Sequence, residues 1–474
     1  MKGNLSWIGF VGLLILIKSS AFAQKRPNVL FILSDDHSAP YLGCYGNSDL
    51  KTPNIDRLAK EGALFKKAYT TAPQCVQSRS SLMTGRNVLA VDMLRFSSAL
   101  PAEHITFPEM MRKDGYFIGV CGRSYHLDGS GNFDPPETKE VFQELGLVTF
   151  PRRFDFVKGG GDTKVAELVE EFIDMVPKGK PFAMWVNYSN PHRVFTAKEF
   201  EPKPENLNMP YELPDIKSVR EDLAAHYGEI QELDMYIGKL WEILEKRGLM
   251  DNTIIIFMGD NGSALLRGKG TLYRCGIHVP LLVRYPKKVR KGVVSDVLVS
   301  GIDIAPTILD LTAVKGIKEI EGRSFVSALN GDTAQLHDYV FAVRGPHAAT
   351  LPLNSALFDL SRTVLNKDFK LIYNPLWQIP YMPVDFDTSP LWADLKQKAG
   401  SNALEPRFMK APIFTPVRPM FELFDLHNDP YEFVNLAGNE AYKTIEHDLM
   451  KALHRWMIIN RDVVPLPIPG GRKP

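Results

Sequence analysis

The sequence predicts an α/β fold, in which a doubly wound, mostly parallel sheet is followed by a smaller C-terminal α+β domain. Three apolar, β-branched runs, typical of strands buried on both faces, each end in polar residues. They cover residues 28–36, 181–192 and 253–262, and residues 116–121 form a fourth run of this kind. Helical patterns lie between the runs, at 53–65, 162–176 and 219–247. Alternating strands and helices indicate parallel pairing.

A different pattern begins after about residue 331. Short strands are expected at 339–343, 370–373 and 421–425, with a closing helix near 440–459. The proline-rich stretch 374–416 predicts a long structured loop. We therefore expect a signal peptide at residues 1–23, the main α/β domain at 24–330, and a smaller domain with an antiparallel sheet at 331–474.

The N-terminus has the pattern of an export signal. Met1 and Lys2 precede an apolar stretch at 7–17, and Ala21-Phe22-Ala23 is a small-x-small cleavage site. A membrane anchor is the competing interpretation, but the apolar stretch is shorter than the roughly 20 residues that a spanning helix needs. The sequence thus predicts a periplasmic or secreted protein without a membrane anchor.

The charge balance excludes partners that bind through the net charge of the whole protein. Lys and Arg number 56 against 55 Asp and Glu, which leaves a formal charge of +1, so neither nucleic acid nor an anionic membrane is expected as a partner. Four cysteines in an exported chain allow three pairings. For Cys44, Cys121 and Cys275 we favour buried thiols, with one bridge plus a spare thiol as the alternative.

Acidic and amide side chains follow two of the predicted strands. Asp35 and Asp36 end the first strand, and Asp260 and Asn261 end the third. Ligands bind at the carboxyl ends of strands in such sheets, so these side chains are expected to meet. Crowded carboxylates repel one another, and a hard cation bound through oxygen, Ca²⁺ or Mg²⁺, relieves that repulsion. For either pair alone, a helix or turn cap is an equal alternative.

The fourth cysteine, Cys75, precedes a run of hydroxyl side chains that begins a predicted helix. A helix N-terminus carries positive potential, and Arg79 adds a fixed charge with a bidentate fork. This environment suits a tetrahedral oxyanion or a thiol of lowered pKa, while a capped helix with a packed thiol is the alternative. A thiolate is a poor ligand for a hard cation, so an oxygen in place of the sulfur fits the predicted metal site better.

Six motifs occur in a characteristic order and spacing. They are RPNVLFILSDDH, CVQSRSSLMTGR, GRSYH, NPHR, FMGDNG and GKGTLYRCGIHVPLLVRYP. Together they resemble the type I formylglycine-dependent sulfatases, and FELFDLHNDPYEFVNLAG resembles the closing segment of that family. The resemblance covers nearly all of the chain after the signal. It implies an alkaline-phosphatase-like fold and hydrolysis of sulfate.

This resemblance implies that Cys75 is a precursor rather than the nucleophile. Sulfatases convert the cysteine at this position to formylglycine, whose hydrated aldehyde presents two hydroxyls. One hydroxyl attacks sulfur, and the other, once deprotonated, expels sulfate and restores the aldehyde. A formylglycine-generating maturase is therefore an implied partner.

The same resemblance implies the metal ligands. Asp35, Asp36, Asp260 and Asn261 match the Ca²⁺ ligands of the family, with an oxygen of the modified Cys75 also near the ion; Mg²⁺ is the alternative. The ion would bind a sulfate oxygen as a Lewis acid.

Cations and histidines complete the implied catalytic set. Arg79 and Lys269 match the groups that hold the nucleophile and the sulfate. Arg123 stands where many sulfatases have lysine, so the charge is kept, although arginine cannot deliver a proton. His126 follows at the three-residue spacing of iduronate-sulfatase-like members. His192 of NPHR matches the histidine beside the scissile bond, a candidate general acid for the leaving group.

The chain departs from the family pattern at two places. Most sulfatases have Pro or Ala two residues after the modified cysteine, where this chain has Gln77, which puts maturation in question because proline fixes φ and lacks an N–H. Arg274, Cys275 and His278 replace an expected acidic residue, Gly and Arg. Arg274 adds positive charge near the pocket and concerns either the substrate or the surface.

The candidate substrate-binding residues come from a narrower resemblance. Residues 371–392 and SNPHR are similar to stretches of heparan N-sulfatase (sulfamidase), although sulfamidases have Asp at the position of Asn190. Trp377, Tyr381 and Asp385 are candidates to line a sugar subsite, and Arg193 is a further candidate. For any single residue of the loop, a plug at the domain interface is an equal alternative.

The leading hypothesis is an exported, Ca²⁺-dependent sulfuric ester or sulfamate hydrolase. It would act from the end of a heparan- or heparin-derived saccharide, with N-sulfoglucosamine as the candidate unit. Alternatives are an O-sulfatase acting at 2-O or 6-O, a phosphate or phosphonate ester hydrolase with the same nucleophile, and a non-catalytic saccharide-binding protein in which Gln77 leaves Cys75 unmodified.

Overall fold

The computed structural model describes residues 26–96, 99–128, 136–347 and 358–467. The predicted signal segment, residues 1–23, lies outside this range and stays a prediction. Within the described residues, every helix falls short of the length or the apolar character that a membrane span requires.

The largest sheet has eight strands and confirms the predicted doubly wound architecture. Strand β1 lies in the middle, paired in parallel with β6 and β7, while β8 runs antiparallel to both β7 and β2. In spatial order the strands are β5 (Phe156–Gly159), β4 (Phe117–Gly122), β6 (Phe182–Asn187), β1 (Asn28–Ser34), β7 (Thr253–Gly259), β8 (Leu281–Arg284), β2 (Ala63–Phe65) and β9 (Val293–Ser295).

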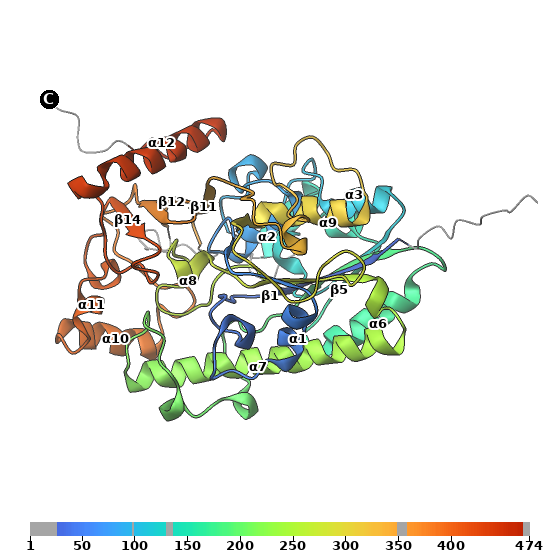
Figure 1. The fold of residues 1–474 in the computed structure, drawn as a ribbon, viewed down its shortest axis with the longest axis horizontal. Helices are drawn as coiled ribbons and strands as arrows, with labels where there is room; N and C mark the ends of the chain where they lie inside the picture. The colour runs from blue at the N-terminus through green and yellow to red at the C-terminus, as the bar shows by residue number, and fades with distance from the viewer. Residues whose placement is uncertain (1–25, 97–98, 129–135, 348–357, 468–474) are drawn as a thin grey trace, which may run out of the picture.

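Helices cover both faces of this sheet (Figure 1). Alternate side chains of β1 point to opposite faces, so Phe31 belongs to one core and Ile32 to the other. On one face lie α2 (Cys75–Thr84), α3 (Phe107–Lys113) and α9 (Ile304–Thr312); on the other lie α1 (Pro53–Glu61), α6 (Val165–Met175) and α7 (Lys217–Lys246). A strand buried on both sides explains why β1 reads as one continuous apolar run.

The C-terminal part forms a four-stranded antiparallel sheet, as expected. Its strands follow chain order: β11 (Val340–Arg344), β12 (Ser361–Leu365), β13 (Phe369–Tyr373) and β14 (Phe421–Asp425). Helix α12 (Lys443–Ile459) packs on one face of this sheet through Leu449 and Leu453. Figure 1 shows this unit at one end of the molecule, beyond the large sheet.

Shorter elements connect the two sheets and their helices. A two-stranded pair joins β3 (Ala68–Tyr69) to β10 (Val299–Ser300). The remaining helices are α4 (Pro136–Glu144), α5 (Phe150–Arg153), α8 (Arg274–Ile277), α10 (Pro390–Gly400) and α11 (Pro406–Met409).

Two expectations for local structure were wrong. The helix expected over 53–65 ends at Glu61, and residues 63–65 form β2, because pairing with β8 outweighs the helical pattern. Gly62 permits this change, since a Cβ there would lie 2.1 Å from the carbonyl oxygen of Val283. The stretch 374–416 is also more than a loop, because it contains α10, whose N-terminus Ser389 caps by accepting from the Trp392 amide.

All four cysteines have free thiols, and the expected burial is confirmed for Cys121 and Cys275 but not for Cys44. Cys75, Cys121 and Cys275 are buried, whereas Cys44 is half-buried.

Candidate active site

Two adjacent strands bring the acidic residues together. Strand β1 ends at Ser34 and β7 at Gly259, so Asp35 and Asp260 begin neighbouring loops at the same edge of the sheet. The loops are tightly packed: a Cβ on Gly259 would lie 2.4 Å from the carbonyl oxygen of His37. The Asp36 amide donates to Oδ1 of Asp260 at 3.0 Å, which fixes one loop against the other.

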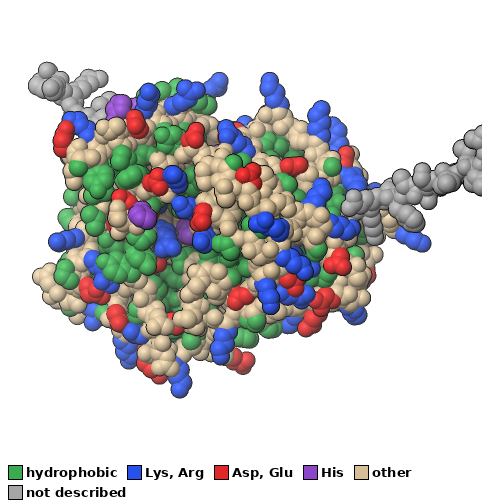
Figure 2. Space-filling view, viewed as in Figure 1, with side chains coloured by type: hydrophobic (Ala, Val, Ile, Leu, Met, Phe, Trp, Pro, Cys, Tyr) green, Lys and Arg blue, Asp and Glu red, His purple; other side chains and the backbone are tan. Residues whose placement is uncertain are grey.

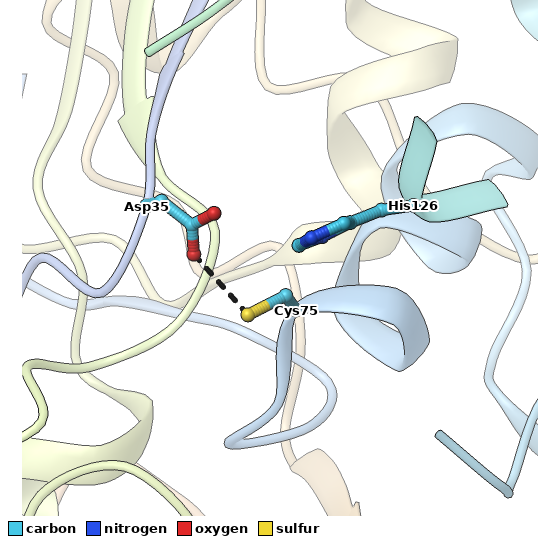
Figure 3. Close-up of side chains that lie close together, drawn as sticks. All are labelled: Asp35, Cys75 and His126. Atoms are coloured by element: carbon cyan, nitrogen blue, oxygen red, sulfur yellow. Dashed lines mark hydrogen bonds between the residues drawn. The ribbon is translucent and has the colours of Figure 1, made fainter. Parts of the chain in front are cut away.

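Helix α2 aims Cys75 at this edge. Cys75 is the first helical residue, Gln74 before it is extended, and Gly85 ends the helix at φ 66°. Every residue of α2 is buried, so the helix is held on all sides and not by one apolar face. Figure 3 shows the Cys75 thiol pointing at Asp35, with Sγ 3.2 Å from Oδ1. The same sulfur lies 3.8 Å from Oδ1 of Asp36.

The carboxylates and the sulfur form a group suited to a metal ion. One possible ligand atom from each of Asp35, Asp36, Cys75 and Asp260 lies within 4.8 Å of the others. Asn261 adds an amide whose buried Oδ1 has no hydrogen-bond partner among the described residues. Three buried carboxylates and an orphaned amide oxygen are hard oxygen donors, so the residues fit a divalent cation.

The acidity of the three carboxylates differs. Burial raises the pKa of Asp36 to about 7 against the opposing charge of Lys269. Burial and the neighbouring Asp35 raise the pKa of Asp260 to about 7 as well. Burial also opposes the charge of Asp35, but Arg123 and Arg79 hold the pKa of that carboxyl well below its usual range. A bound cation would favour the ionised form of all three.

Two arginines and a lysine are paired directly with these carboxylates. Arg79 is fully buried and donates to Asp260 at 2.8 Å and to Asp35 at 3.1 Å. Arg123 Nε lies 2.7 Å from Asp35. Lys269 Nζ lies 2.9 Å from the Asp36 carboxylate and 2.5 Å from Oδ2 of Asp385. Burial opposes the lysine charge, but Asp36 and Asp385 raise the pKa of Lys269 well above its usual range. The predicted cations are therefore all charged and all in contact with the acidic group.

The Cys75 thiol is not poised to react as a thiolate. Burial, followed by the charge of Asp35, raises the pKa of this thiol well above its usual range. Deprotonation beside three carboxylates would place like charges together, and the opposing charge of Lys269 is too small to offset burial and Asp35. This geometry is consistent with a residue whose sulfur is not itself the nucleophile.

Both predicted histidines reach the group. His126 Nε2 accepts from Arg123 Nε at 3.1 Å, and Figure 3 shows the His126 ring near Cys75. His192 Nε2 lies 3.6 Å from Asp36 and 3.5 Å from Asp385. Burial and then Lys269 lower the pKa of His192 to about 4. Its side chain keeps 16% of its surface accessible, so a ligand can approach it.

We call this set the strand-end cluster: Asp35, Asp36, Cys75, Arg79, Arg123, His126, His192, Asp260, Asn261 and Lys269. Figure 2 shows histidine, basic and acidic side chains gathered in a hollow on the visible face of the molecule. All six residues predicted as catalytic and all predicted metal ligands belong to it.

The predicted substrate-binding residues divide into two groups. Asp385 lies beside the cluster through Lys269 and His192. Arg193 instead binds Asp222 with Nη1 at 2.7 Å and the carbonyl of Ala264 with Nε, so its guanidinium is already engaged. A sugar contact through Arg193 would have to compete with that ion pair.

Tyr381 and Trp377 lie apart from the cluster in the described contacts. Tyr381 is buried and lines a small interior cavity that also touches Arg344 and Arg418. The carbonyl of Trp377 accepts from the Arg418 amide at 2.9 Å. Their role at a sugar subsite stays a prediction, because these contacts favour the plug that was the alternative.

The structure adds neighbours that the sequence did not single out. Asn187 Oδ1 accepts from Arg79 at 2.9 Å, at the end of β6. His347 Nε2 lies 3.9 Å from Asp385, its Nδ1 lies 3.1 Å from Nε2 of Gln74, and Phe96 packs against its ring. His347 follows β11 by three residues. A search for polar residues just after the strands of the second sheet, as was done for the first sheet, would have identified His347.

Comparison with known proteins gives a consistent result. A family model described as Sulfatase matches residues 27–314. An "Ulvan-active sulfatase" of Formosa agariphila is 30% identical over 478 residues, covering 94% of this chain and 76% of the relative. The N-sulphoglucosamine sulphohydrolase of Homo sapiens is 29% identical, covering 94% of this chain and 92% of the relative.

Solved structures agree on the fold. One described as a complex with its substrate, D-glucosamine-2-N,6-O-disulfate, superposes with a TM-score of 0.67 at 20% identity, covering 93% of this chain and 99% of the other. A phosphonate monoester hydrolase from Silicibacter pomeroyi superposes with a TM-score of 0.69 at 19% identity, covering 93% and 96%. At these identities the likeness concerns the fold alone.

Proposed function

The chain belongs to the sulfatase family, and on that premise we propose that it removes sulfate from the terminal N-sulfoglucosamine of heparan- or heparin-derived saccharides. As a member of the family it is a sulfuric ester or sulfamate hydrolase. The observation that carries the proposal is the strand-end cluster, where Cys75 faces three carboxylates and three cations in a hollow with an accessible histidine.

The choice of saccharide rests on the relatives. One is named for N-sulphoglucosamine, others for ulvan, and another for N-acetylglucosamine-6-O-sulfate. We favour the N-sulfate because the N-sulphoglucosamine sulphohydrolase is 29% identical and the N-acetylglucosamine-6-O-sulfatase 24%, each over nearly the whole of both chains. Export of the protein is part of the proposal and is supported by the pattern of residues 1–23.

Two groups beyond the unmodified side chains are part of the mechanism. Formylglycine at position 75 supplies an oxygen nucleophile, and a divalent ion, which we propose to be Ca²⁺, supplies Lewis-acid polarisation of a sulfate oxygen. Asp35, Asp36, Asp260 and Asn261 would hold the ion. The position of residue 75 at the N-terminus of α2 favours negative charge there, because unpaired amides and the helix dipole point toward it.

The fixed cations bind and orient the sulfate. Lys269 and Arg123 each contact a carboxylate while remaining next to residue 75, so they can hold an anion without a large movement. Arg79 is fully enclosed and acts by keeping Asp35 and Asp260 in place. Asp385 holds Lys269 from the other side, which orients the ammonium toward the cluster.

His192 is the proposed proton donor to the leaving atom, and the negative charge of a bound sulfate would raise the pKa of His192 from about 4 so that it can carry the proton. Its side chain keeps 16% of its surface accessible, and no other described histidine contacts both Asp36 and Asp385. An alkyl oxygen or a nitrogen of a sugar leaves poorly as an anion, so a positioned acid would contribute about a hundredfold or more.

The experiment that tests this proposal combines mass spectrometry with activity. The peptide containing Cys75 is measured in protein made with a formylglycine-generating maturase, to establish that Gln77 permits conversion. Sulfate release is then measured from N-sulfoglucosamine and from 6-O-sulfated and 2-O-sulfated disaccharides. Converted protein should release sulfate from N-sulfoglucosamine fastest, and Cys75→Ala should lower the rate by at least about a thousandfold.

Two results would contradict the proposal. Converted protein that releases sulfate from none of these saccharides would remove the substrate assignment. Persistent thiol at Cys75 in every host tested would favour the non-catalytic saccharide-binding alternative.

A further inference from the structure

A second cavity lies beside the loops that carry the strand-end cluster. Five tyrosines line it, and we call it the tyrosine pocket: Tyr41, Tyr45, Tyr211, Tyr227 and Tyr431. Its volume is about 300 Å³. That size lies at the lower end of the range of about 300 to 1,000 Å³ that is usual for small-ligand sites.

The pocket is formed by continuations of the loops that carry the cluster. Tyr41 follows Asp35 by six residues, and Arg274 of α8, which also lines the pocket, follows Lys269 by five. Ser38 Oγ donates to the carbonyl of Cys275 at 2.7 Å, which joins the two segments. The pocket wall is therefore held by the same packing that fixes the metal-binding loops.

Polar groups of the pocket wall have few partners. Tyr41 is 1% exposed, and its hydroxyl has no hydrogen bond within the described residues. Among the same residues the guanidinium of Arg274 forms no hydrogen bond; it lies 5.6 Å from the Tyr431 ring and is attracted by the charge of Glu212. Glu212 is 3% exposed, and its carboxylate accepts from the Cys275 thiol at 3.3 Å. A buried polar atom without a partner is costly, so a polar ligand that reaches the Tyr41 hydroxyl would be stabilised.

The mouth of the pocket is aromatic. Tyr211 is 45% exposed, and its ring centroid lies 4.9 Å from that of Tyr431. Aromatic faces at a mouth with polar groups beneath them match the two sides of a pyranose ring, which has an apolar face and a hydroxylated edge. Asp49 and Glu212 also line the pocket, and Arg274 is the one cation among the described residues of its lining, so an anionic substituent on such a ring would bind at Arg274.

We propose that the tyrosine pocket binds a unit of an anionic saccharide chain, with Arg274 holding its sulfate or carboxylate group. The choice of a sulfated glycosaminoglycan rests on the proposed function, whereas the site itself rests on the geometry of the pocket. A chain that reaches both sites gains in affinity, because binding at one site raises the effective concentration at the other.

The test measures binding without turnover. Cys75→Ala protein is titrated calorimetrically with heparin-derived tetrasaccharides, and we expect two sites per chain. In the same background, Arg274→Ala should weaken one site by at least about tenfold and leave the other unchanged. Arg247→Ala, which removes a half-buried arginine at the end of α7, is the matched control and should leave both sites intact.

A second variant distinguishes loss of the binding site from misfolding. Tyr211→Ala removes an exposed ring from the mouth and should also weaken the same site by about tenfold, in protein that stays folded. A neutral N-acetylglucosamine tetramer should bind that site at least tenfold more weakly than the sulfated probe. In matured protein, neither variant should change sulfate release from a small aryl sulfate.

The outcomes separate this inference from the proposed function. If the titration shows one site, and neither Arg274→Ala nor Tyr211→Ala weakens it, saccharide binding at the tyrosine pocket is excluded and binding at the strand-end cluster is supported. One site that both variants weaken would support the pocket and count against saccharide binding at the strand-end cluster.

Discussion

The strand-end cluster and the tyrosine pocket share two chain segments but differ in how their polar atoms are bound. In the cluster, Arg79 and Lys269 each contact two carboxylates directly. In the pocket, Arg274 lines the open space, and the buried hydroxyl of Tyr41 has no hydrogen bond within the described residues. The comparison teaches that closely packed opposite charges prepare a site for chemistry, whereas an open wall of unsatisfied polar groups prepares one for binding.

The largest effect is expected from Asp260→Asn. This change removes one metal ligand and one of the two carboxylate partners of buried Arg79, so kcat/KM should fall by about a hundredfold to a thousandfold. Calcium content, measured by elemental analysis of dialysed protein, should fall with it. An unchanged metal content would remove Asp260 from the proposed ligand set.

The matched control is Asp462→Asn in the C-terminal part. The Asp462 side chain is equally buried and pairs with Arg362 through two hydrogen bonds. Breaking that pair should destabilise the fold by about 3 to 5 kcal/mol without changing kcat or metal content. This control separates loss of a buried ion pair from loss of the metal site.

A smaller effect is expected from His192→Ala. If His192 protonates the leaving atom, the variant should lose about a hundredfold in kcat on the saccharide. It should lose much less on 4-nitrophenyl sulfate, whose phenolate leaves without a proton. Equal losses on the two substrates would show that His192 serves binding or metal geometry instead.

Asp385→Asn should have a more modest effect. The Asp385 carboxylate lies 2.5 Å from Lys269 Nζ, so removing its charge weakens the placement of that cation. We expect kcat/KM to fall by about tenfold on aryl sulfate and saccharide alike. If kcat/KM fell on the saccharide alone, the result would indicate that Asp385 contacts the sugar directly.

The last expected effect concerns stability rather than activity, beside the tyrosine pocket. His278 Nε2 lies 2.7 Å from the carbonyl of Lys66, and burial, followed by the charge of Arg274, lowers the pKa of His278 to about 3. Lys370 and Lys67 act in the same direction. The folded protein therefore keeps this ring neutral, whereas the unfolded chain takes up a proton below about pH 6.5.

This difference in pKa between the folded and unfolded states predicts that the free energy of unfolding falls as the pH is lowered. The contribution of His278 to stability is complete above about pH 6.5 and is lost as the pH falls toward 3, at about 1.4 kcal/mol per pH unit. In His278→Gln, the change in unfolding free energy between pH 6.5 and pH 4.5 should be smaller by about 2 to 3 kcal/mol, as measured by denaturant titration. Exposed His427→Gln is the control, and an identical pH dependence in both variants would contradict the assignment.

Prediction from sequence succeeded for the site residues that come directly after buried strands. Asp35 and Asp260 were found because β1 and β7 are continuous apolar runs, and parallel strands must end at a common edge. Prediction was weaker in the C-terminal part. Helix α10 was missed inside a proline-rich stretch, because Pro390 at its first position was counted as a loop residue although it suits a helix start.

The sequence by itself determined the sheet, the acidic and basic residues of the strand-end cluster, and the family, because periodicity and motif spacing are local properties of the chain. Only the tertiary structure decided that Arg193 is committed to Asp222, that His347 approaches Asp385, and that Arg274 faces a cavity. These relations join segments far apart in the chain, and their outcome depends on which polar atoms find partners when the loops pack.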